Sequence, residues 1–161
     1  MTINSYINNY INNIINESIQ NVTHNKKLHD NINSLIPYLN NCYSPYSKFN
    51  VACMMVANNK KYYGVNVENC SYSLTMCAEQ NCVGNIIADG VKPDKIDQII
   101  IISNTCNEIV PCGACRQVMS EFIKPHTKIY TCGTVNNNFN INNIKVYKLK
   151  ELLPQSFNID G

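Results

Sequence analysis

The sequence predicts a three-layer α/β/α domain, in which a mixed sheet of about five strands carries helices on both faces. After an opening pair of strands, segments with the apolar spacing of helices alternate with segments typical of strands. Four consecutive isoleucines at residues 99–102 have the composition of a strand that is buried on both sides. With 161 residues, 45% of them apolar, the chain is long enough to form one hydrophobic core without disulfides.

Helices are expected in the first quarter of the chain. Apolar residues recur every three or four positions over residues 3–22, which places them along one face of a helix. This face either covers the core of the domain or an adjacent subunit, or it binds a dedicated partner. A polar linker is expected over 23–27, followed by a second helix over 28–41 with a kink at Pro37.

The sheet begins with a hairpin. Residues 49–57 and 60–67 have the composition of strands, and Asn58 and Asn59 between them suit a tight turn. The elements expected after the hairpin are a helix over 76–88 that is stopped by Gly90 and Pro93, a strand over 97–103, a helix over 112–123 that ends at Pro125, a strand over 128–133, an Asn-rich loop over 136–143, a strand over 144–149 and a short turn over 151–153.

Charge and composition exclude several classes of function. The net charge is +2 and Arg116 is the single arginine, so little surface is available for nucleic-acid phosphates. The uninterrupted apolar runs, such as residues 99–102, are far too short to cross a membrane. The first residues carry no secretory signal, so we expect a cytoplasmic protein whose nine cysteines are reduced.

Cysteine spacing gives the strongest indication of chemistry. Cys112 and Cys115 are three residues apart and follow Pro111, a residue favoured at helix starts, so both thiols should lie on one face of a helix N-terminus. The positive end of the helix dipole favours thiolates, which bind zinc. Cys77 is the candidate for a third ligand, and three protein ligands with one open position for water are typical of catalytic zinc sites.

A carboxylate accompanies the third cysteine. Glu79 would lie beside the open metal position, where an acid/base group can move protons to and from water. Residues two apart do not share a helix face, so Cys77 and Glu79 can converge only at a first helical turn. We expect Ser73 or Thr75 to cap that turn.

The combination of Cys-x-Glu with Pro-Cys-x-x-Cys is the signature of zinc-dependent deaminases. Here it reads CAE at 77–79 and PCGAC at 111–115. With four further segments the chain closely resembles the small cytidine deaminases that have three cysteine ligands: YSPYSKFNV at 43–51, NVENCSY at 66–72, the flanks of the second motif in VPCGACRQVMSEF at 110–122, and ELLPQSF at 151–157.

The resemblance implies a cytidine deaminase-like fold and activity. One zinc ion per chain would be held by Cys77, Cys112 and Cys115 and would lower the pKa of a water molecule. Glu79 would carry protons during hydrolysis of cytidine, and of deoxycytidine, to the uridine product and ammonia in pyrimidine salvage. We therefore divide the chain into an N-terminal helical extension, residues 1–24, and a cytidine deaminase catalytic domain, residues 25–161.

The nucleoside site is also implied by the resemblance. Asn66 and Glu68 match residues that hydrogen-bond the ribose hydroxyls, and the charge of Glu68 would repel a phosphate, so a free nucleoside is expected. Phe49 matches the aromatic residue that packs against the pyrimidine ring, and the backbone of Ala78 is expected to contact the base.

The resemblance further implies a homotetramer with active sites shared between subunits. Tyr72 and Phe157 match positions that contribute to a neighbouring subunit's site. Phe157 lies close to the C-terminus, where an isolated aromatic residue has no obvious core to enter. The alternative is that it packs against Leu152 or Leu153 of its own chain.

Two positions depart from the family pattern. Gln80 stands where three-cysteine members usually carry an arginine that hydrogen-bonds the ligand sulfurs. Three thiolates leave zinc with a net charge of −1, so Arg116, adjacent to a ligand, is a candidate for compensating that charge. Ala52 stands where the family usually has glycine.

Other interpretations remain open. A related zinc deaminase would act on another base or on an aminonucleoside antibiotic, although the NVEN segment at 66–69 favours cytidine. A structural zinc protein or a redox dithiol would leave Cys77, Glu79 and NVEN without a role. The histidines, His24, His29 and His126, are expected at the surface. The remaining cysteines are expected to be small buried side chains: Cys42, Cys53, Cys70, Cys82, Cys106 and Cys132.

Overall fold

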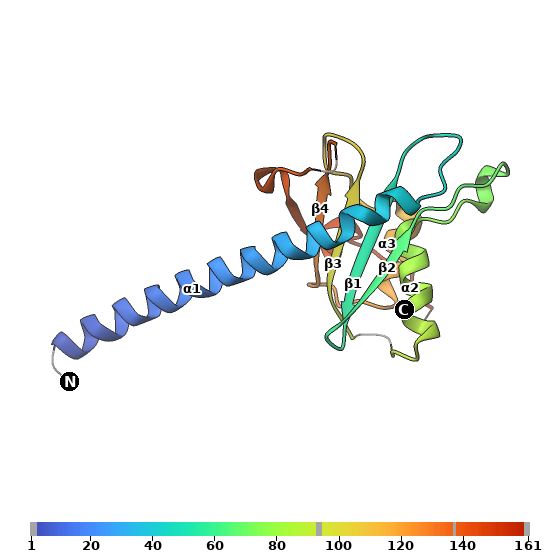
Figure 1. The fold of residues 1–161 in the computed structure, drawn as a ribbon. Coiled ribbons are helices and arrows are strands. Elements are labelled where there is room, and N and C mark those ends of the chain that lie inside the picture. The colour runs from blue at the N-terminus through green and yellow to red at the C-terminus, as the bar shows by residue number, and fades with distance from the viewer. Residues whose placement is uncertain (1–2, 93–94, 137, 160–161) are drawn as a thin grey trace. The chain divides into compact units, whose positions relative to one another are not determined.

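The computed structural model describes residues 3–92, 95–136 and 138–159 (Figure 1). Its contacts divide the chain into two units, Met1–Asn33 and Ser34–Gly161. The proposed division after residue 24 stays a prediction. Pro93, expected to help stop a helix, lies outside the described residues.

The first unit is helical throughout its described residues, and its helix, α1 (Ile3–Leu35), continues into the second unit. The linker expected over 23–27 is wrong, because these residues continue α1. None of them is glycine or proline, and the Thr23 hydroxyl donates to the carbonyl of Ile19 at 2.9 Å within the same helix. What the apolar face of α1 packs against stays a prediction.

Proline ends the long helix. The α conformation is disfavoured for a residue that precedes proline, which here is Ile36 before Pro37. The α-helix α1 ends just before it, at Leu35. The chain then tightens into a 3₁₀ helix, η1 (Ile36–Asn41). The helix expected over 28–41 therefore changes type near Pro37 instead of bending there.

The predicted five-stranded mixed sheet is confirmed. Its strands are β1 (Val51–Ala57), β2 (Lys60–Val65), β3 (Ile96–Ser103), β4 (Lys128–Gly133) and β5 (Lys145–Lys148), in the order β2-β1-β3-β4-β5. Among these five described strands, β3 and β4 pair in parallel, and the other three pairs are antiparallel. Asn58 and Asn59 take left-handed backbone angles, φ 50° and 62°, as a two-residue hairpin turn requires.

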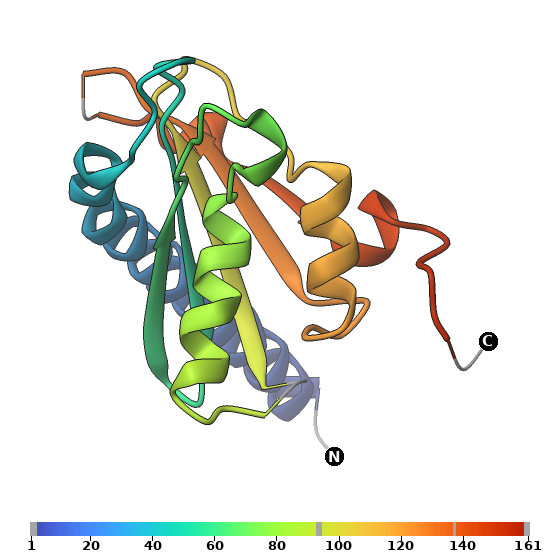
Figure 2. The ribbon, with the colours of Figure 1, turned by 90° about the vertical axis from the view of Figure 1, so that its right-hand side faces the viewer.

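Helices cover both faces of this sheet. The helices α2 (Ala78–Ala88), α3 (Gly113–Ser120) and α4 (Leu149–Leu152) lie on one face (Figure 2), where they share a core with the strands. Tyr62 of β2 belongs to that core, so the next residue, Tyr63, faces the other way. The ring of Tyr38, in η1, stacks on Tyr63 with centroids 4.3 Å apart, which places η1 on the opposite face.

A glycine lets α2 approach the edge strand. Gly64 of β2 faces α2, and a Cβ atom there would lie 2.2 Å from the carbonyl oxygen of Ala78 and 2.5 Å from the nitrogen of Cys82. Any larger residue would therefore push away the first turns of α2. The close contact fixes the N-terminus of α2 against the sheet.

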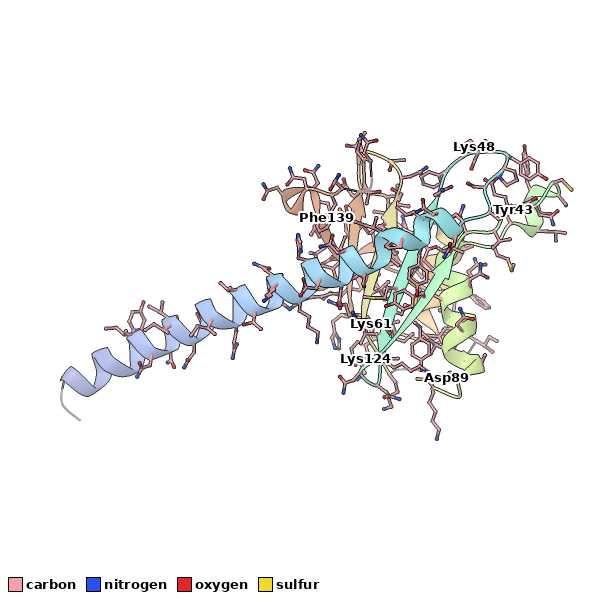
Figure 3. All side chains as sticks on the ribbon, in the orientation of Figure 1. Tyr43, Lys48, Lys61, Asp89, Lys124 and Phe139 are labelled. Carbon is pink, nitrogen blue, oxygen red and sulfur yellow. The ribbon has the colours of Figure 1, made fainter. Side chains whose placement is uncertain are left out.

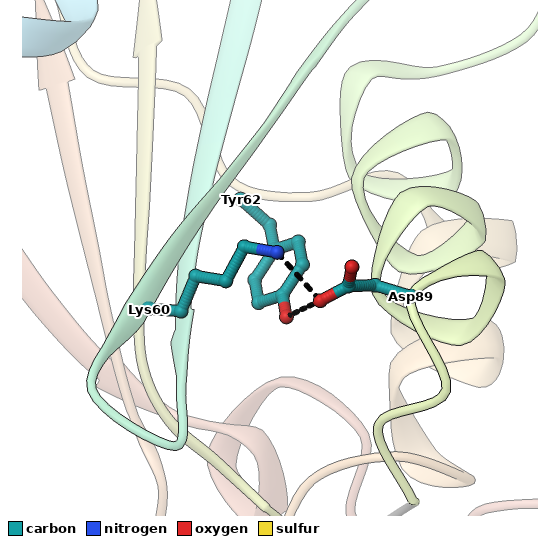
Figure 4. A network of polar contacts seen from close by, with 3 residues as sticks. All are labelled: Lys60, Tyr62 and Asp89. Atoms are coloured by element: carbon teal, nitrogen blue, oxygen red, sulfur yellow. Dashed lines mark hydrogen bonds and ion pairs between the residues drawn. The ribbon is translucent and has the colours of Figure 1, made fainter.

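The C-terminal end of α2 is tied to the hairpin by side chains (Figure 4). Asp89, which follows the last residue of α2, accepts hydrogen bonds from Lys60 Nζ at 2.6 Å and from the Tyr62 hydroxyl at 2.5 Å. The hydrogen bond from Lys60 is the largest cause that lowers the pKa of Asp89, and the bond from Tyr62 lowers it further. Both ends of α2 are thus held on β2.

Among the described residues, no helix combines the length and apolar composition needed to cross a membrane.

Candidate active site and metal centre

Two helix N-termini bring the three predicted ligands together. Cys77 precedes α2 and Cys112 precedes α3, each as the N-cap residue in extended conformation. Their Sγ atoms are 3.9 Å apart, and the buried Cys115 lies in the first turn of α3. All three Sγ atoms lie within 4.8 Å of one another. The predicted convergence of Cys77, Cys112 and Cys115 is therefore present.

Hydrogen bonds prepare these sulfur atoms for a cation. The backbone nitrogen of Cys115 donates to Cys112 Sγ at 3.4 Å, as a capped helix start allows. A hydrogen bond shared with Cys115 lowers the pKa of Cys77 to about 7 and raises that of Cys115. Closely spaced soft donors, one of them a readily ionised thiol, suit zinc, and the partly exposed Cys77 and exposed Cys112 leave the cluster open to a ligand. The residues present fit one zinc ion per chain.

The glutamate lies in the first turn of a helix, as the sequence predicted. Glu79 is the second residue of α2, and its side chain is only 5% exposed. Burial raises the pKa of its carboxyl group, which therefore takes up a proton more readily than a carboxyl in water. The predicted cap was wrong: Cys77 itself is the N-cap, and the Thr75 hydroxyl accepts from the nitrogen of Asn69 at 3.3 Å. Ser73 lies in the 3₁₀ helix η2 (Tyr72–Leu74).

A pocket of about 480 Å³ opens beside the cysteines and the glutamate. Its volume is in the range of small-molecule sites. It unites Cys77, Glu79 and Cys112 with the four residues predicted to bind the base and the ribose. The lining residues are Ser47, Phe49, Val51, Asn66, Glu68, Thr75, Cys77, Ala78, Glu79, Ile109, Val110 and Cys112.

Asn66 and Glu68 also hold the loop that carries Phe49. The Asn66 amide donates to the carbonyl of Phe49 at 2.8 Å and accepts from the nitrogen of Val51 at 2.9 Å. Glu68 accepts from the backbone nitrogens of Tyr46 and Ser47, at 2.9 and 3.3 Å, and from the Ser47 hydroxyl. The hydrogen bond from the Ser47 side chain is the main cause that lowers the pKa of Glu68, which therefore stays charged.

Ser47, Ile109 and Val110 line the pocket, although the sequence analysis gave them no role. Ser47 could have been found, because it lies inside the YSPYSKFNV segment, two residues before Phe49. The two apolar residues precede the second cysteine motif in a loop, where no periodic pattern indicates which side chains face a site.

Tyr72 and Phe157 are not among the pocket's lining residues in the single chain. Tyr72 is 75% exposed and contacts the ring of Tyr46 edge-on, with centroids 5.9 Å apart. Phe157 is 72% exposed. Exposure of both rings fits neither a local core role nor a role in their own pocket.

Gln80 contacts a sulfur atom of the cysteine cluster, whereas Arg116 contacts backbone carbonyls. Gln80 Nε2 donates to Cys115 Sγ at 3.8 Å, so the residue in the arginine position still reaches a ligand sulfur. Arg116 donates instead to two backbone carbonyls, Pro111 O at 2.7 Å and Leu152 O at 2.9 Å. Charge compensation by Arg116 stays a prediction.

The other cysteines follow the prediction only in part. Cys53, Cys82 and Cys132 are buried, and burial raises the pKa of Cys132 to about 11. Cys70 and Cys106 are exposed, because they lie in turns that leave the sheet, so their predicted burial is wrong. Cys42 is partly buried, and the histidines, His24, His29 and His126, are exposed as expected.

The side chains that can bind a metal are different from the side chain that can carry protons. Three cysteines converge on one point, and a buried carboxyl group that is not part of the cluster lies in the adjoining pocket. Zinc-dependent deaminases are the class that this fold and site define, since they combine a cysteine-held zinc with a glutamate that is not a ligand.

Comparison with known proteins identifies the family. The chain belongs to the cytidine and deoxycytidylate deaminases, because residues 26–132 match the family described as "Cytidine and deoxycytidylate deaminase zinc-binding region". A cytidine deaminase of Mycoplasma genitalium is 38% identical over 116 residues, which cover 71% of this chain and 83% of the relative. One from Halalkalibacterium halodurans is 35% identical over 116 residues, covering 71% and 82%.

A solved structure agrees with this assignment. The crystal structure of cytidine deaminase from Burkholderia pseudomallei matches with a TM-score of 0.72 and 35% sequence identity. The match covers 80% of this chain and 98% of that chain. The predicted cytidine deaminase-like fold is therefore confirmed.

Proposed function

We propose that this protein is a cytidine deaminase, which hydrolyses cytidine, and deoxycytidine, to the corresponding uridine and ammonia. The observation that carries this proposal is the position of Glu79, buried in the pocket that Cys77 and Cys112 also line. A protein that used zinc only for structure would have no need of a buried carboxyl group beside an accessible metal cluster.

Cys77, Cys112 and Cys115 would hold the zinc ion, which would supply an acidified water as the nucleophile. Glu79 takes a proton from the water that attacks C4 of the base and delivers it to the ring nitrogen N3. It then helps to pass a proton to the departing amino group, which leaves as ammonia. Because burial favours the protonated carboxyl, Glu79 can both hold and release protons during one turnover.

The other end of the pocket binds the nucleoside. Phe49 packs against the pyrimidine ring, and the backbone of Ala78 contacts the base. Asn66 and Glu68 hydrogen-bond the ribose hydroxyls. The pKa of Glu68 is lowered, so the negative charge that it presents disfavours a phosphate on the sugar. This arrangement supports a free nucleoside as substrate and pyrimidine salvage as the setting.

The assembly that we propose is a homotetramer in the cytoplasm. Residues 25–161 are the catalytic domain, and residues 1–24 are a helical extension. Tyr72 and Phe157 each complete the site of a neighbouring subunit, which accounts for two large rings that are exposed in a single chain. No nucleic acid and no membrane takes part.

A substrate panel tests the proposal. The purified full-length protein is mixed with cytidine, deoxycytidine, guanine and the aminonucleoside blasticidin, and ammonia release is measured. We expect turnover of the first two compounds. Turnover of guanine or blasticidin alone would instead indicate the related deaminase. Failure with all four, together with reversible thiol oxidation of Cys112 and Cys115, would indicate a redox dithiol.

A further inference from the structure

A single hydroxyl group lies between two residues of the proposed nucleoside site. We propose that Ser47 is a positioning residue, whose hydroxyl holds the Glu68 carboxylate and the Phe49 backbone in one fixed arrangement for binding a nucleoside. This inference rests on the proposed function, because it assigns Glu68 to the sugar and Phe49 to the base.

Both hydrogen-bonding capacities of the hydroxyl are used. Ser47 Oγ donates to Glu68 Oε1, and it accepts from the backbone nitrogen of Phe49 at 3.0 Å. The backbone nitrogen of Ser47 also donates to Glu68 Oε2, at 3.3 Å. Ser47 therefore contacts both oxygens of the carboxylate and the neighbour that carries the aromatic ring. All three residues line the same pocket.

The local backbone explains why a serine fits here. Lys48, between Ser47 and Phe49, takes a left-handed conformation with φ 58°, and lies at the outer end of its loop (Figure 3). This reversal turns the nitrogen of Phe49 back toward the hydroxyl two residues earlier, an arrangement typical of serine and threonine. Asn104 Nδ2 donates to the carbonyl of Lys48 at 2.9 Å and supports the turn.

The geometry leaves Glu68 prepared for one more donor. An ionised carboxylate has about four acceptor sites. Within the described part of the chain, three are occupied, by the nitrogens of Tyr46 and Ser47 and by the Ser47 hydroxyl. The free site is available to a hydroxyl of the sugar. Without the Ser47 hydroxyl, the carboxylate could rotate, and Phe49 would lose one of the hydrogen bonds that fix its backbone.

Steady-state kinetics of Ser47→Ala test this assignment. We expect KM for cytidine to rise about tenfold, the effect of losing one hydrogen bond to a charged group, with kcat within about twofold of wild type. Ser47→Thr keeps a hydroxyl and should restore most of the affinity. Ser44→Ala is the matched control: Ser44 lies in the same loop, its hydroxyl donates to Asn50, and it does not line this pocket.

A double-mutant cycle separates positioning from general loop stability. If Ser47 acts through Glu68, adding Ser47→Ala to Glu68→Gln should raise KM by much less than the tenfold seen alone. Independent, multiplying effects would overturn the proposal, as would an unchanged KM in Ser47→Ala. Uridine affinity, measured by calorimetry, gives a readout apart from turnover. If Ser47→Ala weakens uridine binding but the wild-type chain does not deaminate cytidine, only the proposed function would be contradicted.

Discussion

The side-chain amide of Gln117 forms two hydrogen bonds with the backbone of Phe157, one to its carbonyl and one to its nitrogen. Gln117 Nε2 donates to the Phe157 carbonyl at 2.9 Å, and Gln117 Oε1 accepts from the Phe157 nitrogen at 3.1 Å. Both hydrogen bonds are made by the Phe157 backbone, and the ring is 72% exposed. Since Gln117 belongs to α3, two residues after Cys115, the tail is fixed to the helix that contains one predicted metal ligand and is capped by another, Cys112.

Replacing Phe157 by alanine should therefore affect substrate binding more than stability. An exposed ring adds little to the packing of its own chain, so the melting temperature should stay close to wild type. KM for cytidine should rise, because the ring completes the site of a neighbouring subunit in the proposed tetramer. Thermal unfolding and steady-state kinetics check this. A lower melting temperature with unchanged KM would support local packing against Leu152 or Leu153, and a fully active monomer by light scattering would exclude shared sites.

Gln80→Ala should weaken zinc binding. The Gln80 amide donates to Cys115 Sγ, and groups that hydrogen-bond metal ligands typically contribute 10–100-fold to affinity. We expect a loss of roughly tenfold or more, measured by competition with a chromophoric chelator. Gln80→Arg keeps a donor at this position and should retain or tighten the zinc. Equal zinc affinity in wild type and Gln80→Ala would show that the contact has no effect on the metal.

Gly64→Ala should destabilise the protein by about 1–3 kcal/mol, as overpacking does. The added methyl group would lie 2.2 Å from the carbonyl oxygen of Ala78, at the start of α2. Gly84→Ala is a matched control in the interior of α2, since a Cβ there meets nothing within 4 Å. That variant should be stabilised by up to about 1 kcal/mol. Chemical denaturation of both variants decides, and equal stability would contradict the close approach of α2 to β2.

Glu68 should titrate below the usual range of a glutamate. Hydrogen bonds from the Ser47 hydroxyl and from the Tyr46 and Ser47 nitrogens, with the nearby Lys48 charge, lower its pKa. Because the folded-state pKa is depressed, ionised Glu68 favours the folded state above the unfolded pKa, and this contribution is lost as pH falls through the folded pKa. Carboxyl NMR titration, assigned with Glu68→Gln, measures it. Ser47→Ala should raise the pKa, and an unchanged value would contradict the hydrogen-bond assignment.

The sequence predicted the Cys112 and Cys115 part of the metal site well because its signals are local. The three-residue spacing of Cys112 and Cys115 at a helix start fixes their thiols on one face, and Pro111 marks that start. The Asn58–Asn59 turn was equally predictable, since two left-handed residues are needed there. These features depend on neighbours in the sequence.

Features that depend on distant parts of the chain were not predictable in the same way. Residues 23–27 are polar, but their composition does not distinguish a solvent-exposed linker from one stretch of a long helix. Ser47 reaches Glu68 because the backbone of Tyr43 is hydrogen-bonded to Asn66 and Glu68, which brings two distant segments together. The rings of Tyr72 and Phe157 are largely exposed in the single chain, so their proposed role requires knowledge of the assembly.

The central claim is that Glu79 carries protons while the three cysteines hold the metal, and Glu79→Gln tests it most directly. The variant keeps the size of the side chain and leaves the sulfur ligands in place. Zinc content and cytidine turnover are measured on the same preparation. We expect one zinc per chain and a fall in kcat of about 10⁴-fold, the upper end of general acid–base effects, because Glu79 makes several successive transfers. Retained zinc with a loss of less than about tenfold would contradict the assignment.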